Sequence, residues 1–105
     1  MKIASKDIIV NLKRLTNQVY KLLPYREEGI DWKTPLSNIV IELYGMADTL
    51  KQQHAMLFSL ICRLRGLNSL DREDDFILFR STVFECLNLI NFITESVKEM
   101  REWEV

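Results

Sequence analysis

The side chains most able to do chemistry are those of the single histidine, His54, and of one cysteine, Cys86. If the two longest predicted helices form an antiparallel hairpin, residues whose numbers sum to about 138–140 lie level. Glu85 and Cys86 then lie near His54, as the parts of a nucleophilic site would. No glycine-rich loop is present nearby to hold an oxyanion. We therefore expect His54 to hydrogen-bond Glu85 or Gln53, Cys86 to fill apolar space, and the protein to have no enzymatic activity.

The sequence predicts no metal or cofactor. Asp71, Glu73 and Asp75 alternate as acids do in a calcium-binding loop. Such a loop needs glycine at its sixth position and glutamate at its twelfth, where this chain has Phe76 and Thr82. The phosphate-binding loops and the histidine and cysteine spacings typical of zinc sites are also missing from the sequence.

The two cysteines and the apolar runs favour a cytoplasmic protein. Cys62 and Cys86 form no CxxC pair and are too few for a disulfide scaffold, so we expect no bond between them. Lys6 and Asp7 interrupt the apolar residues near the start, which argues against a signal peptide. The longest charge-free run, 52–62, is too short to span a bilayer, and we expect no membrane contact.

Three helices are predicted in a single domain, 1–105. The first covers about residues 6–23 and ends at Pro24. Its apolar residues recur in steps of three and four, which places them on one face. They are Ile8, Leu12, Leu15, Val19 and Leu22.

The second predicted helix covers 34–65, with Thr34 as N-cap and Pro35 at the first helical position. Gly66 favours a left-handed cap at its end, and Gly45 indicates a close helix crossing. A leucine recurs every seven residues, at Leu36, Leu43, Leu50, Leu57 and Leu64. A sustained heptad is typical of helices that pack side by side.

The third predicted helix begins at Asp71, after a short turn, and repeats its apolar residues with the same period. These are Phe76, Phe79, Val83, Cys86, Ile90, Ile93, Val97 and Met100. A short turn between long helices with matching heptads predicts an antiparallel hairpin. The fold class is therefore all-α: a three-helix antiparallel bundle in which two long helices form a hairpin beside a shorter N-terminal helix.

The helix lengths do not match, and this predicts a homodimer. Helix two is about 45 Å long and helix one only about 27 Å, which leaves the hairpin tip uncovered. The tip is apolar: it holds Phe58, Leu60, Ile61, Leu64, Leu67, Leu70, Phe76, Ile77 and Phe79. Further apolar residues lie outside the seam, among them Ile41, Tyr44, Phe84 and Phe92. Large exposed apolar patches mark interfaces, so we expect the bundle to dimerise into a larger one. Alternatively, the connection after helix one is long enough, about 40 Å when extended, to let that helix reach the tip.

The segment 24–33 is the only long connection, and it mixes aromatic with charged residues. Tyr25 and Trp32 could anchor a partner protein. The same residues could instead pack across the open end of the bundle.

The predicted function is a small, non-catalytic protein-interaction module (an adaptor, regulator or inhibitor) that self-associates and binds another protein through the tip or the segment 24–33. The alternative is a nucleic-acid-associated subunit. Its phosphate contacts would come from Arg63, Arg65, Arg72 and Arg80 with Lys13, Arg14 and Lys21. The net charge of -1 gives no overall attraction to nucleic acid, and acids surround the arginines, so we expect ion pairs there.

Overall fold

A computed structural model describes residues 5–103, and the side chains of residues 7–100. This part of the chain is all-helical, as predicted, and contains no strand. The helices are α1 (Ser5–Glu27), α2 (Lys33–Gly45), α3 (His54–Gly66) and α4 (Phe76–Trp103). Short 3₁₀ turns lie at Lys51–Gln53, Leu67–Ser69 and Glu73–Asp75.

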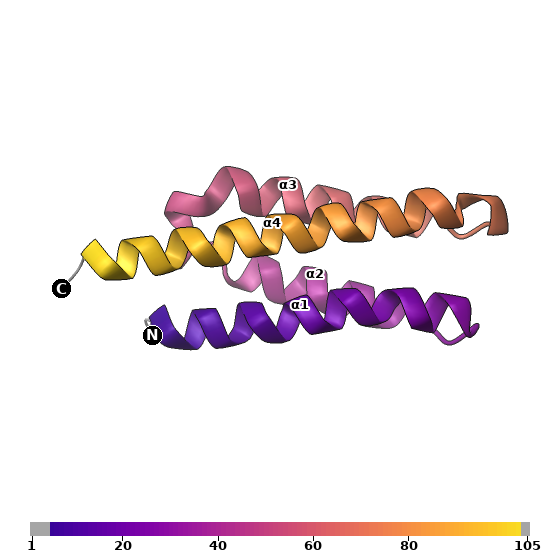
Figure 1. The fold of residues 1–105 in the computed structure, drawn as a ribbon, viewed down its shortest axis with the longest axis horizontal. Helices are drawn as coiled ribbons and strands as arrows, with labels where there is room; N and C mark the ends of the chain where they lie inside the picture. The colour runs from indigo at the N-terminus through magenta and orange to yellow at the C-terminus, as the bar shows by residue number, and fades with distance from the viewer. Residues whose placement is uncertain (1–4, 104–105) are drawn as a thin grey trace.

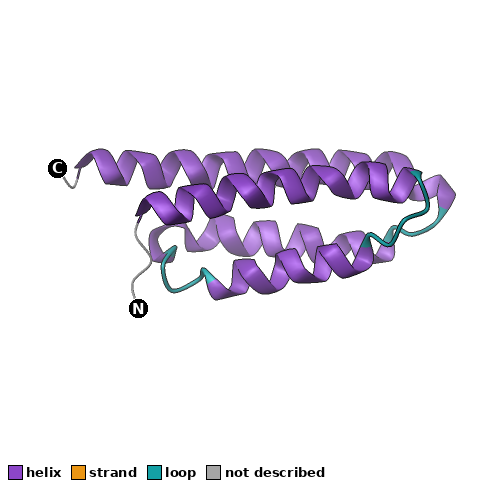
Figure 2. Ribbon diagram, turned by 90° about the horizontal axis from the view of Figure 1, so that it is seen from below, coloured by secondary structure: helices purple, strands orange, loops and turns teal. Residues whose placement is uncertain are grey.

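The helices form an up-and-down bundle that measures 49 × 21 × 18 Å. The chain reverses direction at each of the three connections, so α1 begins and α4 ends at the same end of the bundle (Figures 1 and 2). Each helix packs against two neighbours, in the cyclic order α1, α2, α3, α4.

The predicted helix over 34–65 is two helices, and the described chain has four helices in place of three. The helix stops at Gly45, and the N–H groups of Met46 and Ala47 close the last turn on main-chain carbonyls three residues back. The chain then turns and resumes as α3 at His54. Glycine, Asp48 and Thr49 are weak helix formers, which lowers the cost of a reversal here. A Cβ added at Gly45 would meet no atom within 4 Å, so this glycine marks the end of a helix and not a close helix crossing.

The leucine heptad predicted burial correctly but not connectivity. Leu36, Leu43, Leu50, Leu57 and Leu64 are all at most 1% exposed. A heptad places its residues on one face whether the helix is continuous or folded back halfway. Folding back brings both halves against α1 and α4, and one core results.

The first helix passes through Pro24 and ends at Glu27, so the prediction that Pro24 stops it was wrong. Proline removes one hydrogen bond, to the carbonyl of Tyr20, which lies at an exposed position that water can reach. The N–H of Glu28 still bonds the carbonyl of Pro24. The chain then leaves the helix at Gly29, whose φ of 70° is in the left-handed region.

Three predicted helix ends also differ. The last helix was predicted to begin at Asp71, but α4 begins at Phe76, after the 3₁₀ turn Glu73–Asp75. Gly66 has a φ of -62°, so no left-handed cap occurs there, and the chain continues into a 3₁₀ turn. The helix α2 begins at Lys33. The main-chain N–H groups of its first turn bond the side chain of Asp31, and not that of Thr34, the predicted N-cap. The Oδ1 atom of Asp31 accepts from the main-chain N–H of Lys33 at 3.0 Å and of Thr34 at 3.2 Å.

Candidate interaction surfaces

The possible nucleophilic group of His54, Glu85 and Cys86 is not assembled. Glu85 pairs with Arg63 at 3.2 Å, and Gln53 bonds Ser96 Oγ at 3.2 Å. These contacts shift α3 against α4 by about nine positions from the predicted register, so His54 lies far along the bundle from Glu85. The prediction that His54 lies near Glu85 and Cys86 was wrong.

His54 is also on the surface instead of the apolar seam. It is exposed, and its ring packs edge-on against Phe58 with 4.4 Å between the ring centroids. The helix α3 starts at His54, so the heptad that placed it beside Leu50 and Leu57 is interrupted just before it.

The two cysteines are free, as predicted. The observed register places them level with each other, but Cys62 is exposed and Cys86 is fully buried. Burial raises the pKa of the Cys86 thiol to about 12. A thiol of that pKa is almost entirely protonated near neutral pH and is a poor nucleophile.

The predicted hairpin tip is mostly core. Ile61, Leu64, Leu67 and Phe79 are at most 1% exposed within a single chain. The reason is the reversal after Gly45, which lays α2 beside α3 and α1 over α4. Leu60 is fully buried as well, and Leu70 and Phe76 are half-buried. The two exposed members of the predicted tip are Phe58 at 39% and Ile77 at 82%. The tip therefore offers no continuous apolar surface, and the length mismatch no longer argues for a dimer.

Trp32 packs across the end of the bundle. It is half-buried, and its ring meets that of Phe79 edge-on, with 4.9 Å between centroids. Lys33 places its ammonium 5.5 Å from the Trp32 ring and pairs with Asp71 at 3.2 Å. The connection between α1 and α2 is thereby fixed to the connection between α3 and α4.

Arg26 completes this end of the bundle, and the sequence analysis did not identify it. Its guanidinium lies 4.7 Å from the centroid of the Phe79 ring. Its Nη2 atom donates to the main-chain carbonyls of Leu70 at 2.8 Å and Arg72 at 2.6 Å. The signal was its spacing, because Arg26 lies four residues after Leu22, on the buried stripe of α1. Because the helix was predicted to end at Pro24, Arg26 was not counted among its residues.

The predicted basic residues are partly neutralised by acids. Arg14 pairs with Glu42 at 2.7 Å and Arg63 with Glu85 at 3.2 Å, and all four side chains are about half exposed. The hydrogen bonds that Arg14 donates to the Glu42 carboxylate raise the pKa of Arg14. Arg65 reaches the Tyr44 hydroxyl at 3.4 Å. Among the described side chains, Arg14 and Arg63 are thus the two of these seven basic residues that pair with an acid.

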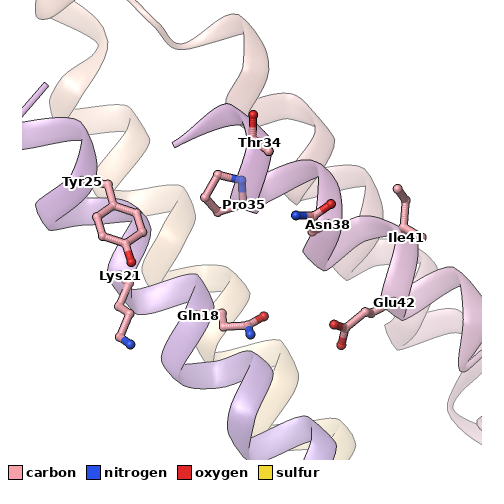
Figure 3. Close-up of a pocket in the computed structure, with 8 residues that line it drawn as sticks. All are labelled: Gln18, Lys21, Tyr25, Thr34, Pro35, Asn38, Ile41 and Glu42. Carbon is pink, nitrogen blue, oxygen red and sulfur yellow. The ribbon is translucent and has the colours of Figure 1, made fainter. Parts of the chain in front are cut away.

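A groove of about 540 Å³ runs between α1 and α2 (Figure 3). It is lined by Gln18, Lys21, Tyr25, Thr34, Pro35, Asn38, Ile41 and Glu42, so the predicted partner-binding residue Tyr25 lies on its wall. Small-molecule sites enclose most of their ligand and are mainly apolar. Here both walls carry exposed, mixed side chains, among them Lys21, Asn38 and Ile41. Such a groove does not enclose a ligand.

Large apolar side chains remain exposed outside these features. Those more than 35% exposed are Val10, Tyr20, Ile30, Ile41, Tyr44, Phe58, Ile77, Leu78, Phe84 and Phe92. Four of them belong to α4. The segment Glu73–Met100 contains a stretch with a mean hydropathy of 1.5, of which only 28% is buried. By length and composition this helix could cross a membrane, but core helices of soluble bundles meet the same criterion.

The fold and its surfaces thus define a four-helix up-and-down bundle whose outer face is partly apolar. Comparison of the chain with protein-family models, curated proteins and solved structures found no match.

Proposed function

We propose that this chain is a small, non-catalytic helical protein-interaction module, an adaptor, regulator or inhibitor, that self-associates and binds another protein. In this proposal it acts in the cytoplasm and closes a larger bundle by dimerisation. The observation that carries the proposal is the exposure of large apolar side chains, above all Ile77, Phe84 and Phe92 on α4.

Exposed apolar groups of this size have a free-energy cost in water. Burying one such side chain fully is worth roughly 1.5–3 kcal/mol, whereas association costs about 4–15 kcal/mol in lost freedom of motion. One exposed residue is therefore insufficient, and several on one helix from each of two chains are needed to favour association. The helix α4 supplies four per chain.

Light scattering on the wild-type chain tests self-association directly. We expect the average mass to rise above the 12.4 kDa of a single chain as the concentration increases through tens of micromolar. A mass of 12.4 kDa at every concentration would contradict self-association.

A nucleic-acid-associated subunit is the competing function. The pairing of Arg14 and Arg63 with carboxylates favours the protein-interaction module. Phosphate contacts weaken steeply with added salt, whereas apolar contacts do not. Binding of a short DNA or RNA duplex that is lost between about 50 and 200 mM salt would support the competing function.

A further inference from the structure

The outermost side of α4 forms a continuous ridge, which we define by Ile77, Ser81, Phe84, Asn88, Phe92, Glu95 and Glu99. All seven are exposed. At 100° per residue, Asn88 points opposite to the core residues Phe79 and Val97. Ridges this far from a core are normally charged. Here Ile77 is 82% and Phe92 is 60% exposed.

The two phenylalanines of the ridge are placed symmetrically about Asn88. Phe84 precedes this asparagine by four residues and Phe92 follows it by four. If two copies pack antiparallel about a two-fold axis at Asn88, each Phe84 meets the second copy's Phe92, and the contact occurs twice. The two Asn88 side chains meet on the axis, where amides can bond each other, and a single polar residue in such a seam sets the register.

The charges beside the ridge select the antiparallel arrangement. Arg80 lies eight residues before Asn88, with its guanidinium 5.6 Å from the centroid of the Phe84 ring. Glu95 lies seven residues after Asn88, and its one ion pair among the described side chains is an exposed contact with Lys98 at 3.4 Å. Antiparallel packing brings each Arg80 close to the second copy's Glu95. Parallel packing would instead oppose like charges at both positions.

We propose that the ridge is the self-association interface, and that a second copy of this chain packs antiparallel on it with Asn88 on the two-fold axis. This inference rests on the proposed function and adds the surface, the orientation and the register. The contact runs over residues 77–99, about 33 Å of helix. This contact also explains why α4 is apolar although only 28% of its most apolar stretch is buried within the chain.

A charge on the ridge tests which surface associates. Phe92→Asp places a carboxylate in the seam of each copy, and we expect the dimer dissociation constant to rise at least about 100-fold in sedimentation equilibrium. Ile41→Asp is the matched control, because Ile41 on α2 is 64% exposed and Phe92 is 60% exposed. The control should dimerise as the wild type does. Because the side chains of Phe92 and Ile41 are both exposed, we expect each variant to keep the wild-type helix content. Circular dichroism checks this.

Cysteine cross-linking tests the orientation and does not depend on the charge variants. The background is Cys62→Ser, since Cys62 is exposed, whereas the buried Cys86 can stay. Asn88→Cys should form a disulfide-linked dimer under mild oxidation. Ser81→Cys should not, because antiparallel packing separates the two copies of residue 81 by about 21 Å. Parallel packing would link both variants.

The outcomes separate this inference from the proposed function. If the protein dimerises but Phe92→Asp has no effect and Asn88→Cys does not cross-link, self-association stands and the ridge is not the interface. If the wild type is monomeric, both proposals fail. A monomer that sediments with phosphatidylcholine vesicles, and loses this with Phe92→Asp, would mean that the ridge meets lipid instead of a second copy.

Discussion

The inward and outward faces of α4 differ in how far one chain satisfies them. The inward face carries Phe79, Val83, Cys86 and Ile90, all fully buried in the core of the bundle, where α4 packs against α1 and α3. The outward face carries Ile77, Phe84 and Phe92, which contact water. The inward face is apolar throughout, whereas the outward face alternates these three large apolar side chains with polar ones, Ser81, Asn88, Glu95 and Glu99.

This difference shows that hydrophobic patterning alone does not identify a core. The buried face is recognisable because it meets complementary stripes on neighbouring helices, whereas the ridge meets none within the chain. An exposed apolar face that no other helix of the chain covers either binds another molecule or lowers the solubility of the protein.

The largest contrast should be in thiol reactivity. Cys86 is buried and its pKa is raised to about 12, so alkylation at pH 8 requires the helix to open and the thiol to ionise. We expect Cys86 to react about 1,000-fold more slowly than a cysteine placed two positions away by Asn88→Cys. Mass spectrometry of peptides after timed iodoacetamide labelling measures both rates, at a concentration low enough to keep the chain monomeric. Comparable rates would contradict the burial of this face.

Truncation of an inward aromatic should cost the most stability. Phe79→Ala removes a fully buried ring that also contacts Trp32 and Arg26, and we expect a loss of about 3–5 kcal/mol in the free energy of unfolding. Ile77→Ala, on the ridge, should change the monomer by no more than about 0.5 kcal/mol. Urea denaturation of the two variants gives both values. An equal loss from both would abolish the distinction between the faces.

The two arginines that stack on phenylalanines of α4 provide a third comparison. Arg26→Met loses the stacking on Phe79 and two hydrogen bonds from a charged donor, so we expect a loss of about 1.5–3 kcal/mol. Arg80→Met loses only a contact with the exposed Phe84 ring and should cost about 0.5 kcal/mol or less in the monomer. Arg26→Lys should recover only part of the loss, because an ammonium lacks the planar fork. Full recovery by lysine would mean that charge alone matters there.

The smallest effect on stability should come from two exposed carboxylates, Asp31 and Asp71, that bond residues at the start of α2. Hydrogen bonds from the Thr34 side chain and from the main-chain N–H groups of Thr34 and Lys33 hold the pKa of Asp31 below its ordinary 3.8. A hydrogen bond and the charge of Lys33 do the same for Asp71. A carboxyl group whose pKa is lower in the folded than in the unfolded chain stabilises the fold at any pH above its unfolded pKa. This stabilisation is lost as the pH falls through the folded pKa.

Stability should therefore decrease slightly below about pH 4, and Asp31→Asn should weaken that decrease. Lys33→Met separates the two carboxylates, because it removes the partner of Asp71 but leaves the main-chain hydrogen bonds to Asp31. It should weaken only the part of the decrease that comes from Asp71. Thermal unfolding midpoints between pH 2.5 and 6 measure the effect. A wild-type midpoint that rises in acid would contradict the sign.

Much of the fold was predictable from the sequence, and the candidate surface was not. The periodic stripes of the chain identified the buried leucines, such as Leu36 and Leu64, because burial depends on the spacing of apolar residues along a helix. The exposure of Phe84 and Phe92 was also expected from their positions outside the seam. The tip and the placing of His54 were wrong for one reason, the assumed continuous helix over 34–65.

The spacing of apolar residues in the sequence establishes that the chain is helical, that most residues of its apolar stripes are buried, and that apolar side chains are left over. The packing of the helices decides that the chain reverses after Gly45, that Arg26 joins two connections, and that three of the exposed apolar side chains, Ile77, Phe84 and Phe92, lie on the outer ridge of α4. The physical reason is that helix formation and burial follow local spacing, whereas a reversal depends on long-range packing. A glycine and a few weak helix formers allow the chain to continue or to turn, and the gain from closing one core between α1 and α4 selects the turn.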